Sequence, residues 1–440
     1  MQPTTPLALP WAGPFLGVLL SIAVLPMLAP RLWHRRMASV MGLWTAALLL
    51  PWAAAFGAAD ATRLAWHAIL VEYLPFVTLL LALYAAGGGV LVRGGPAGTP
   101  GGNTLMLGVG MALGVVMGQA GAAMVLVNPL LHANAHRRRK VHLPLFLIVL
   151  IANASGALTP LGNPPLYIGF LEGVPFFWPT RHLVAPLAVL AGLLLPAFYL
   201  IDRHLAADEP PAPAPARLHV RGWPNAALIL LTGAVVLAQN AVAAGDISVL
   251  GETVPLMRLV AILAFAAITL ASAAITPKAV RQGNDFTWAP MREVALLFLA
   301  IFVTIQPVLE MLEAGLSGPL APVLRLTLTP DGAPRPAAFF WLAGILSAFL
   351  DNAPTYLVFF NIARIEPAAM TAAQESALAA LSAGAVFFGG LTYIGNAPNM
   401  MVRGVAAHRG VRMPSFLGFL CLSAALLLPV FAVLTALFFH

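Results

Sequence analysis

Long apolar stretches alternate with short polar ones along the whole chain, and about 20 apolar residues are enough to span a membrane as a helix. Residues 202–222, rich in Pro and Ala, separate two sets of six stretches and are predicted to form a short extended cytoplasmic linker. The pattern predicts an all-α polytopic membrane protein. The stretches lie at 11–29, 38–57, 66–92, 104–134, 143–172 and 183–201, then at 224–244, 256–275, 292–313, 337–362, 375–405 and 415–439.

Composition and charge agree with this class. Hydrophobic residues make up 60% of the chain and charged residues 9%, whereas a soluble domain has about 25% charged residues. The net charge of +7 comes from basic residues clustered between the apolar stretches, which is typical of membrane orientation and not of nucleic-acid binding. Because basic residues (Arg31, Arg35, Arg36) follow the first stretch and none precedes it, we expect a retained span and not a cleaved signal peptide.

One ten-residue phrase occurs twice. "GALTPLGNPP" (156–165) and "GGLTYIGNAP" (389–398) are identical at six positions, and each counterpart lies 233 positions later, as from Asn163 to Asn396. Both copies place glycine and proline inside an apolar stretch, where these residues interrupt a helix. The fifth and eleventh stretches are therefore predicted to be broken helices, in which Asn163 and Asn396 can each cap the new half-helix.

The fourth and tenth stretches are predicted to be re-entrant hairpins. A basic run, His136–Lys140, follows the fourth stretch and Arg93 precedes it, so both flanks are expected on the cytoplasmic side. The hairpin tips would be "GQAGAA" (Gly118–Ala123) and "DNAPT" (Asp351–Thr355), again 233 positions apart. Five crossings and a hairpin per half make residues 1–201 and 223–440 inverted repeats, with both termini outside, a pattern typical of secondary transporters.

A broken helix inside a membrane leaves unpaired amides and carbonyls, and it is tolerated where these groups line a polar cavity or pack against protein. Half-helix ends also carry partial charges that hold ions. A single break is most simply a kink, but two matched breaks beside two matched tips favour a common substrate or ion site, where both breaks meet both tips. Its candidate residues are Asn153, Ser155, Thr159, Gly162 and Asn163 at the first break, Thr392, Gly395 and Asn396 at the second, and Gln119, Asn352 and Thr355 at the tips.

Asp351 is the only acid at either hairpin tip. A charged group at membrane depth costs about 2.5–3.5 kcal/mol to insert, so such residues are rare. It could cap the second hairpin arm, or it could bind a cation or carry a proton. With Asn163 and Asn396 it is the candidate sodium site; no cofactor is predicted, and Na⁺ or H⁺ would be the coupling ion. Glu72 lies near the outer end of the third stretch. It could be an interfacial residue, or it could have a functional role.

The pairing of a "DNAPT" hairpin with a "GxLTxxGNxP" break resembles the ion transporter superfamily. That group includes bacterial sodium/proton antiporters, arsenite pumps, citrate–metal symporters and dicarboxylate transporters, and the citrate-transport branch is the most similar. The resemblance implies a scaffold domain that often forms a homodimer and a transport domain of hairpins and broken helices. Dicarboxylate members carry Ser-Asn-Thr triplets at the tips and breaks; these triplets are missing here, which argues against dicarboxylate specificity.

Two transport functions fit the sequence. Sodium/proton antiport through Asp351 ranks first, because the membrane core lacks an Arg or Lys to pair a tricarboxylate. Cation-coupled transport of citrate or another carboxylate is the alternative, since half-helix N-termini can hold an anion without a basic side chain. An intramembrane enzyme ranks lower because Asp351 has no evident acid–base partner, and so does a channel. We expect a secondary active transporter, not an enzyme, in the inner membrane of a bacterium, whose partners are the bilayer and a small ion or carboxylate.

Overall fold

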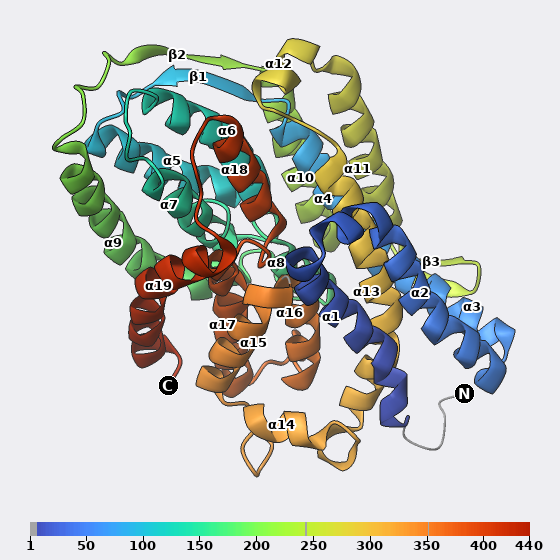
Figure 1. Ribbon diagram of the computed structural model, residues 1–440. Helices are drawn as coiled ribbons and strands as arrows, with labels where there is room; N and C mark the ends of the chain where they lie inside the picture. The colour runs from blue at the N-terminus through green and yellow to red at the C-terminus, as the bar shows by residue number, and fades with distance from the viewer. Residues whose placement is uncertain (1–6, 243, 351) are drawn as a thin grey trace.

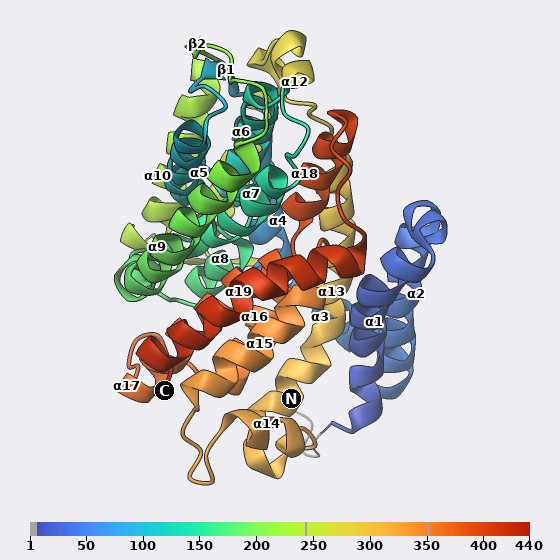
Figure 2. The ribbon, with the colours of Figure 1, turned by 60° about the vertical axis from the view of Figure 1, so that its left-hand side comes forward.

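The computed structural model describes residues 7–242, 244–350 and 352–440 of the 440-residue chain. The chain is mostly helical, as Figures 1 and 2 show. Among the described residues nine helical segments are long and apolar enough to cross a membrane. Two shorter apolar helices, in residues 142–158 and 336–350, belong to the regions where the sequence predicts a break or a hairpin. The predicted all-α polytopic membrane class is therefore confirmed.

One set of helices, here called the scaffold group, packs together on one side of the molecule. The helix α4 packs against α10 and α11, while α13 packs against α1 and α2 (Figure 1). A π-helical turn, Ala68–Tyr73, joins α3 and α4 into a single long segment. The bounds are α1 (Gly13–Leu28), α2 (Pro30–Phe56), α3 (Ala58–His67), α4 (Leu74–Gly87), α10 (Trp223–Ala241), α11 (Leu256–Ile275) and α13 (Ala289–Glu313).

A second set, here called the hairpin group, contains the elements that the repeated phrase predicts. Two long helices, α9 (Trp178–Ala206) and α19 (Phe416–Phe438), pack along its outside. Its members are α5 (Pro100–Met117), α6 (Gln119–Ala133), α7 (His142–Leu150), α8 (Pro164–Leu171), α15 (Pro336–Leu350), α16 (Asn352–Ile362), α17 (Ala372–Phe387) and α18 (Ala397–His408). The remaining helical pieces are α12 (Lys278–Gly283), α14 (Ala321–Thr327) and the 3₁₀ turns Leu9–Ala12 and Gly315–Ser317.

Both predicted hairpin segments are pairs of packed helices, α5 with α6 and α15 with α16. Gly118 alone connects the first pair, with a φ of 75°, a backbone conformation that favours glycine. The second pair is its counterpart 233 positions later. Re-entry on one side of the membrane and inversion of the second repeat stay predictions.

Both predicted helix breaks are present. The helix α7 ends at Leu150 and α8 begins at Pro164, with a 3₁₀ turn, Ala154–Leu158, between them. In the second half α17 ends at Phe387, a 3₁₀ turn covers Phe388–Leu391, and α18 begins at Ala397. Each half-helix starts after an asparagine and carries proline in its first turn, where no amide partner is lost.

The predicted linker, residues 202–222, differs from the expected extended chain. The helix α9 continues to Ala206 because the buried carboxylate of Asp202 is held by Arg137, by Asn103 Nδ2 at 2.8 Å and by His142 Nε2 at 2.8 Å. Just beyond it, the backbone N–H groups of Arg138 and Arg139 donate to the exposed Glu209 carboxylate and lower its pKa.

The structure also contains short strands that the all-α expectation does not include. The last part of the linker, β2 (Ala216–Arg221), pairs antiparallel with β1 (Leu91–Gly95). A second ribbon joins β3 (Asp246–Val249) to β4 (Glu252–Pro255). In Figure 1 the β1–β2 ribbon lies at the end of the molecule opposite α14, and the start of α1 and the end of α19 lie away from that ribbon.

Candidate functional site

The two broken helices meet directly in a buried network of side-chain amides, here called the amide network. Asn396 Nδ2 donates to Asn153 Oδ1 at 3.1 Å and to the Ala152 carbonyl at 3.0 Å. Asn153 Nδ2 in turn donates to Asn399 Oδ1 at 2.9 Å. All three asparagines are buried. The prediction that both breaks face each other is confirmed.

Both hairpin tips reach the same network. Asn352 Nδ2, in the first turn of α16, donates to Asn163 Oδ1 at 2.8 Å. Gln119 lies in the first turn of α6. In one orientation of its side-chain amide, Oε1 accepts from Asn163 Nδ2 at 2.9 Å. With O and N exchanged, which satisfies both atoms, the oxygen accepts instead from Asn396 Nδ2 at 2.6 Å. The Gln119 backbone amide also donates to the Gly162 carbonyl at 3.0 Å. Each tip therefore contacts a break, and Gln119 contacts both.

The sequence predicts that Asn163 and Asn396 cap the half-helices, and their position at the N-cap is correct. Neither side chain makes a capping hydrogen bond. Their amides bond across the molecule instead, because the buried amides of Asn352, Asn153 and Gln119 need partners. The capping role is thus replaced by tertiary contacts between the two halves.

The two candidate threonines make the same hydrogen bond in each half. Thr159 Oγ1 donates to the Val115 carbonyl at 2.6 Å, and Thr392 Oγ1 donates to the Ala348 carbonyl. Donor and acceptor are both displaced by 233 positions. Each hydroxyl ties its break to the first arm of the adjacent hairpin, so these residues hold the breaks in place.

The two candidate glycines allow the broken segment to fold back on itself. A Cβ on Gly162 would lie 2.5 Å from the Gly156 carbonyl oxygen, and one on Gly395 would lie 2.8 Å from that of Gly389. All four glycines belong to the repeated phrase. Their identity in both copies follows from this close backbone approach.

The remaining candidates contribute differently. Ser155 is buried outside the amide network, where its Oγ donates to the Ile151 carbonyl at 2.5 Å and packs against Gly114. Thr355 is buried in the first turn of α16. Asp351 lies outside the described residues, so its roles as cap, proton carrier or sodium ligand stay predictions. Within the described part of the chain no group of three His, Cys, Asp or Glu could hold a metal ion.

Sequence reasoning missed Asn399. Its Nδ2 donates to the carbonyls of Gly389 and Thr392, both at 2.8 Å, while its Oδ1 accepts from Asn153. The signal was its spacing, because a residue three positions after Asn396 lies on the same helix face. Its counterpart in the first half is Leu166, so the network is not symmetric.

Four helices begin at the amide network. They are α6, α8, α16 and α18, which start at Gln119, Pro164, Asn352 and Ala397. A helix N-terminus presents backbone N–H groups and about half a positive charge. Among the described residues the members of the network carry no charged side chain. The peptide dipoles therefore make this region favourable for an anion.

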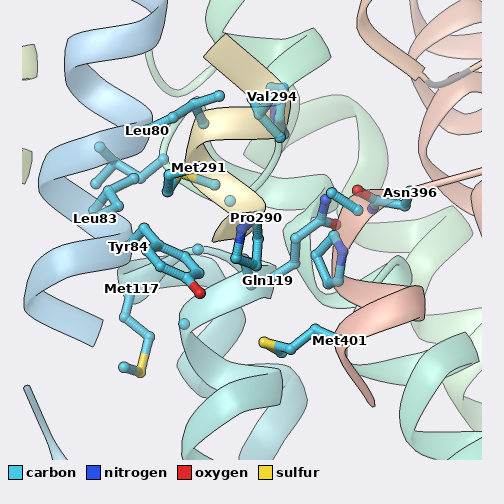
Figure 3. Close-up of a pocket in the computed structure, with 18 of the residues that line it drawn as sticks. Leu80, Leu83, Tyr84, Met117, Gln119, Pro290, Met291, Val294, Asn396 and Met401 are labelled. Carbon is cyan, nitrogen blue, oxygen red and sulfur yellow. The ribbon is translucent and has the colours of Figure 1, made fainter. Parts of the chain in front are cut away.

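A cavity of about 70 Å³ lies beside the network, and Figure 3 shows its lining. The hairpin group supplies Gln119, Gly162 and Asn396, whereas α4 and α13 supply apolar residues such as Leu83 and Met291. A single water needs about 10–15 Å³, so the space suits a few waters or one carboxylate group. The site lies at the boundary between the hairpin group and the scaffold group.

Residues 4–439 match the family described as "Putative citrate transport". The chain belongs to this family. No curated protein matches the sequence.

Proposed function

We propose that this protein is a secondary active transporter that moves citrate or a related carboxylate across the membrane, coupled to a cation. The observation that carries the proposal is the convergence of four helix N-termini, those of α6, α8, α16 and α18, on one amide network. Such termini bind carboxylates through backbone N–H groups and the helix dipole. The description of the family favours the same substrate class.

Sodium/proton antiport, which the sequence ranks first, is less well supported. That ranking rests on the expectation that no Arg or Lys in the membrane core pairs a tricarboxylate, but helix N-termini can supply positive potential without a basic side chain. A cation placed among them would face four partial positive charges. One argument for antiport is Asp351, which could bind the cation or carry the proton. The transport experiment below distinguishes the two functions.

Binding would involve the chain's own amides. Gln119 and Asn396 line the cavity and lie within hydrogen-bonding distance of each other, so a bound carboxylate would exchange amide–amide bonds for charge-assisted ones. The present cavity accepts one carboxylate group, and a whole citrate requires the wall formed by α4 and α13 to move away. Movement of the hairpin group past the scaffold group would provide this space and expose the site to each side in turn.

Uptake into liposomes tests the proposal. The full-length protein is reconstituted, and entry of radiolabelled citrate is measured with an inward Na⁺ gradient, an inward proton gradient, both or neither. We expect uptake above that of protein-free liposomes with at least one of the gradients. Proton movement driven by Na⁺ in the absence of any carboxylate, together with no citrate uptake, would instead support sodium/proton antiport.

A further inference from the structure

A second cavity, of about 300 Å³, lies away from the amide network. It is formed where the π-helical turn Ala68–Tyr73, α11 and α13 of the scaffold group meet the ends of α8 and α16. The eight residues of α8 separate the two regions by roughly 12 Å, at about 1.5 Å per residue. Unlike the first cavity it has several ionisable side chains in its lining, which are His67, Glu72, Glu172, Arg258, Glu310 and Glu313.

Glu72 is a member of this lining whose carboxylate is only half satisfied by hydrogen bonds. Its Oε1 accepts from Gln306 Nε2 at 2.9 Å, while its Oε2 is buried and has no hydrogen-bond partner among the described residues. A buried carboxylate oxygen without a donor is costly, and more so within a membrane span. Glu72 also lies in the π-helical turn, a distortion frequent at functional sites.

The other charged groups around Glu72 do not neutralise it. Arg258, on α11, donates from Nη2 to the Leu171 carbonyl at 2.9 Å and from Nη1 to the Val71 carbonyl at 3.4 Å. His67 is at 3.0 Å from the Glu252 carboxylate. Glu172 faces the cavity from the end of α8, Glu310 and Glu313 face it from α13, and α16 contributes the neutral Leu357 and Asn361. Carboxylates therefore outnumber the cations in this cavity.

We propose that Glu72 is a proton-binding site that couples proton movement to transport, with the second cavity as its route to water. A proton on Oε2 removes the buried charge and supplies a donor that can bond within the polar cavity. A proton needs only this one free oxygen, whereas within the described residues no group of three His, Cys, Asp or Glu could hold a metal ion. This inference rests on the proposed transport function.

The link to transport runs through α8. Arg258 bonds to the last residue of α8, Leu171, and to Val71 next to Glu72, so it connects the proton site to that helix. The other end of α8 begins after Asn163, which belongs to the amide network. Displacement of α8 would therefore change the surroundings of Glu72 and of the substrate site together.

Infrared difference spectroscopy tests the proton site without any substrate. Spectra of the full-length protein in liposomes are recorded between mildly acidic and mildly alkaline buffer, for the wild type, Glu72→Gln and the control Glu366→Gln, which changes an exposed acid. We expect the band of a buried protonated carboxyl to be lost in Glu72→Gln and retained in the control. An unchanged band in Glu72→Gln would overturn the proposal.

Transport of citrate tests the coupling. In Glu72→Gln, uptake driven by a proton gradient should be lost, while citrate/citrate exchange, which needs no net proton movement, should continue; Glu72→Asp should restore driven uptake. Driven uptake at the wild-type level, or loss of exchange as well, would overturn the coupling role. If the wild type moves no citrate, the proposed function fails, and the infrared result still decides whether Glu72 binds a proton.

Discussion

Asn396 Nδ2 donates a hydrogen bond to Asn153 Oδ1 at 3.1 Å, although the two residues are 243 positions apart and belong to different halves of the chain. Asn153 in turn donates to Asn399, so one side chain of the first half satisfies two of the second. The two helix breaks therefore form one buried polar unit, and neither is an isolated kink.

Removing this connection should destabilise the fold. Asn153→Ala leaves the buried Asn399 Oδ1 without its donor, and an unsatisfied buried group costs about 1–3 kcal/mol. Asn396 Nδ2 loses one acceptor but keeps the Ala152 carbonyl at 3.0 Å. The free energy of unfolding can be compared by thermal or denaturant unfolding in detergent. The control Asn240→Ala, at an exposed position of α10, should change it by less than about 0.5 kcal/mol. Equal stability of the two variants would show that the connection is not structurally important.

The matched threonine bonds predict matched effects in the two halves. Thr159→Val and Thr392→Val each remove the hydrogen bond from a break to a hairpin arm, and each should cost at least about 1 kcal/mol. Thr392→Val also removes the acceptor of the Gly395 backbone N–H, so its cost should be the larger of the two. Thr62→Val, at an exposed hydroxyl bonded only within its own helix, is the control and should have little effect. A large effect of one variant and none of the other would argue against equivalent repeats.

The first hairpin tip requires glycine at position 118. Gly118 has a φ of 75°, and a Cβ there would lie 3.0 Å from the Leu161 carbonyl oxygen. Gly118→Ala should therefore destabilise the protein by about 1–3 kcal/mol, as for other strained backbone positions.

Gly108→Ala is the control, and it should raise the stability of the protein where Gly118→Ala lowers it. Gly108 lies inside α5 and a Cβ there meets nothing within 4 Å, so alanine should stabilise the helix by about 0.5–1 kcal/mol. Thermal unfolding of both variants tests the pair. A Gly118→Ala protein as stable as Gly108→Ala would mean that the tip adapts without strain.

Much of the fold could be predicted from the sequence, since hydrophobic length and the duplicated Gly, Asn and Pro positions are local signals. That the two breaks correspond to each other followed from the repeated phrase and its constant offset. The strand β2 was missed inside a stretch that looked like linker, although the apolar Leu218 and Val220 alternate with polar residues there. Its partner β1 is distant in the chain, and such pairing has no local signal.

The site was less predictable because it depends on tertiary partners. Gln306, which holds Glu72, lies 234 positions from it, and nothing in the sequence links the two residues. In the same way, Asn163 and Asn396 occupy predicted N-cap positions but bond to distant amides instead. Position along the chain was predictable, whereas the choice of hydrogen-bond partner was not.

The central claim is that the convergent helix N-termini form an anion site, and a single added charge at the cavity tests it. Ala120 lines the cavity in the first turn of α6 and is only partly buried. Ala120→Asp and Ala120→Asn have nearly the same shape and differ in charge, and the helix terminus itself tolerates an acidic residue.

The measurement is the citrate dissociation constant of both purified full-length variants and of the wild type, by isothermal titration calorimetry. The anion site predicts that Ala120→Asp binds citrate about tenfold or more weakly than Ala120→Asn, because a fixed carboxylate would occupy the positive region and repel the ligand. Equal citrate affinity of the two variants, or a wild type that binds sodium but no citrate, would contradict the claim.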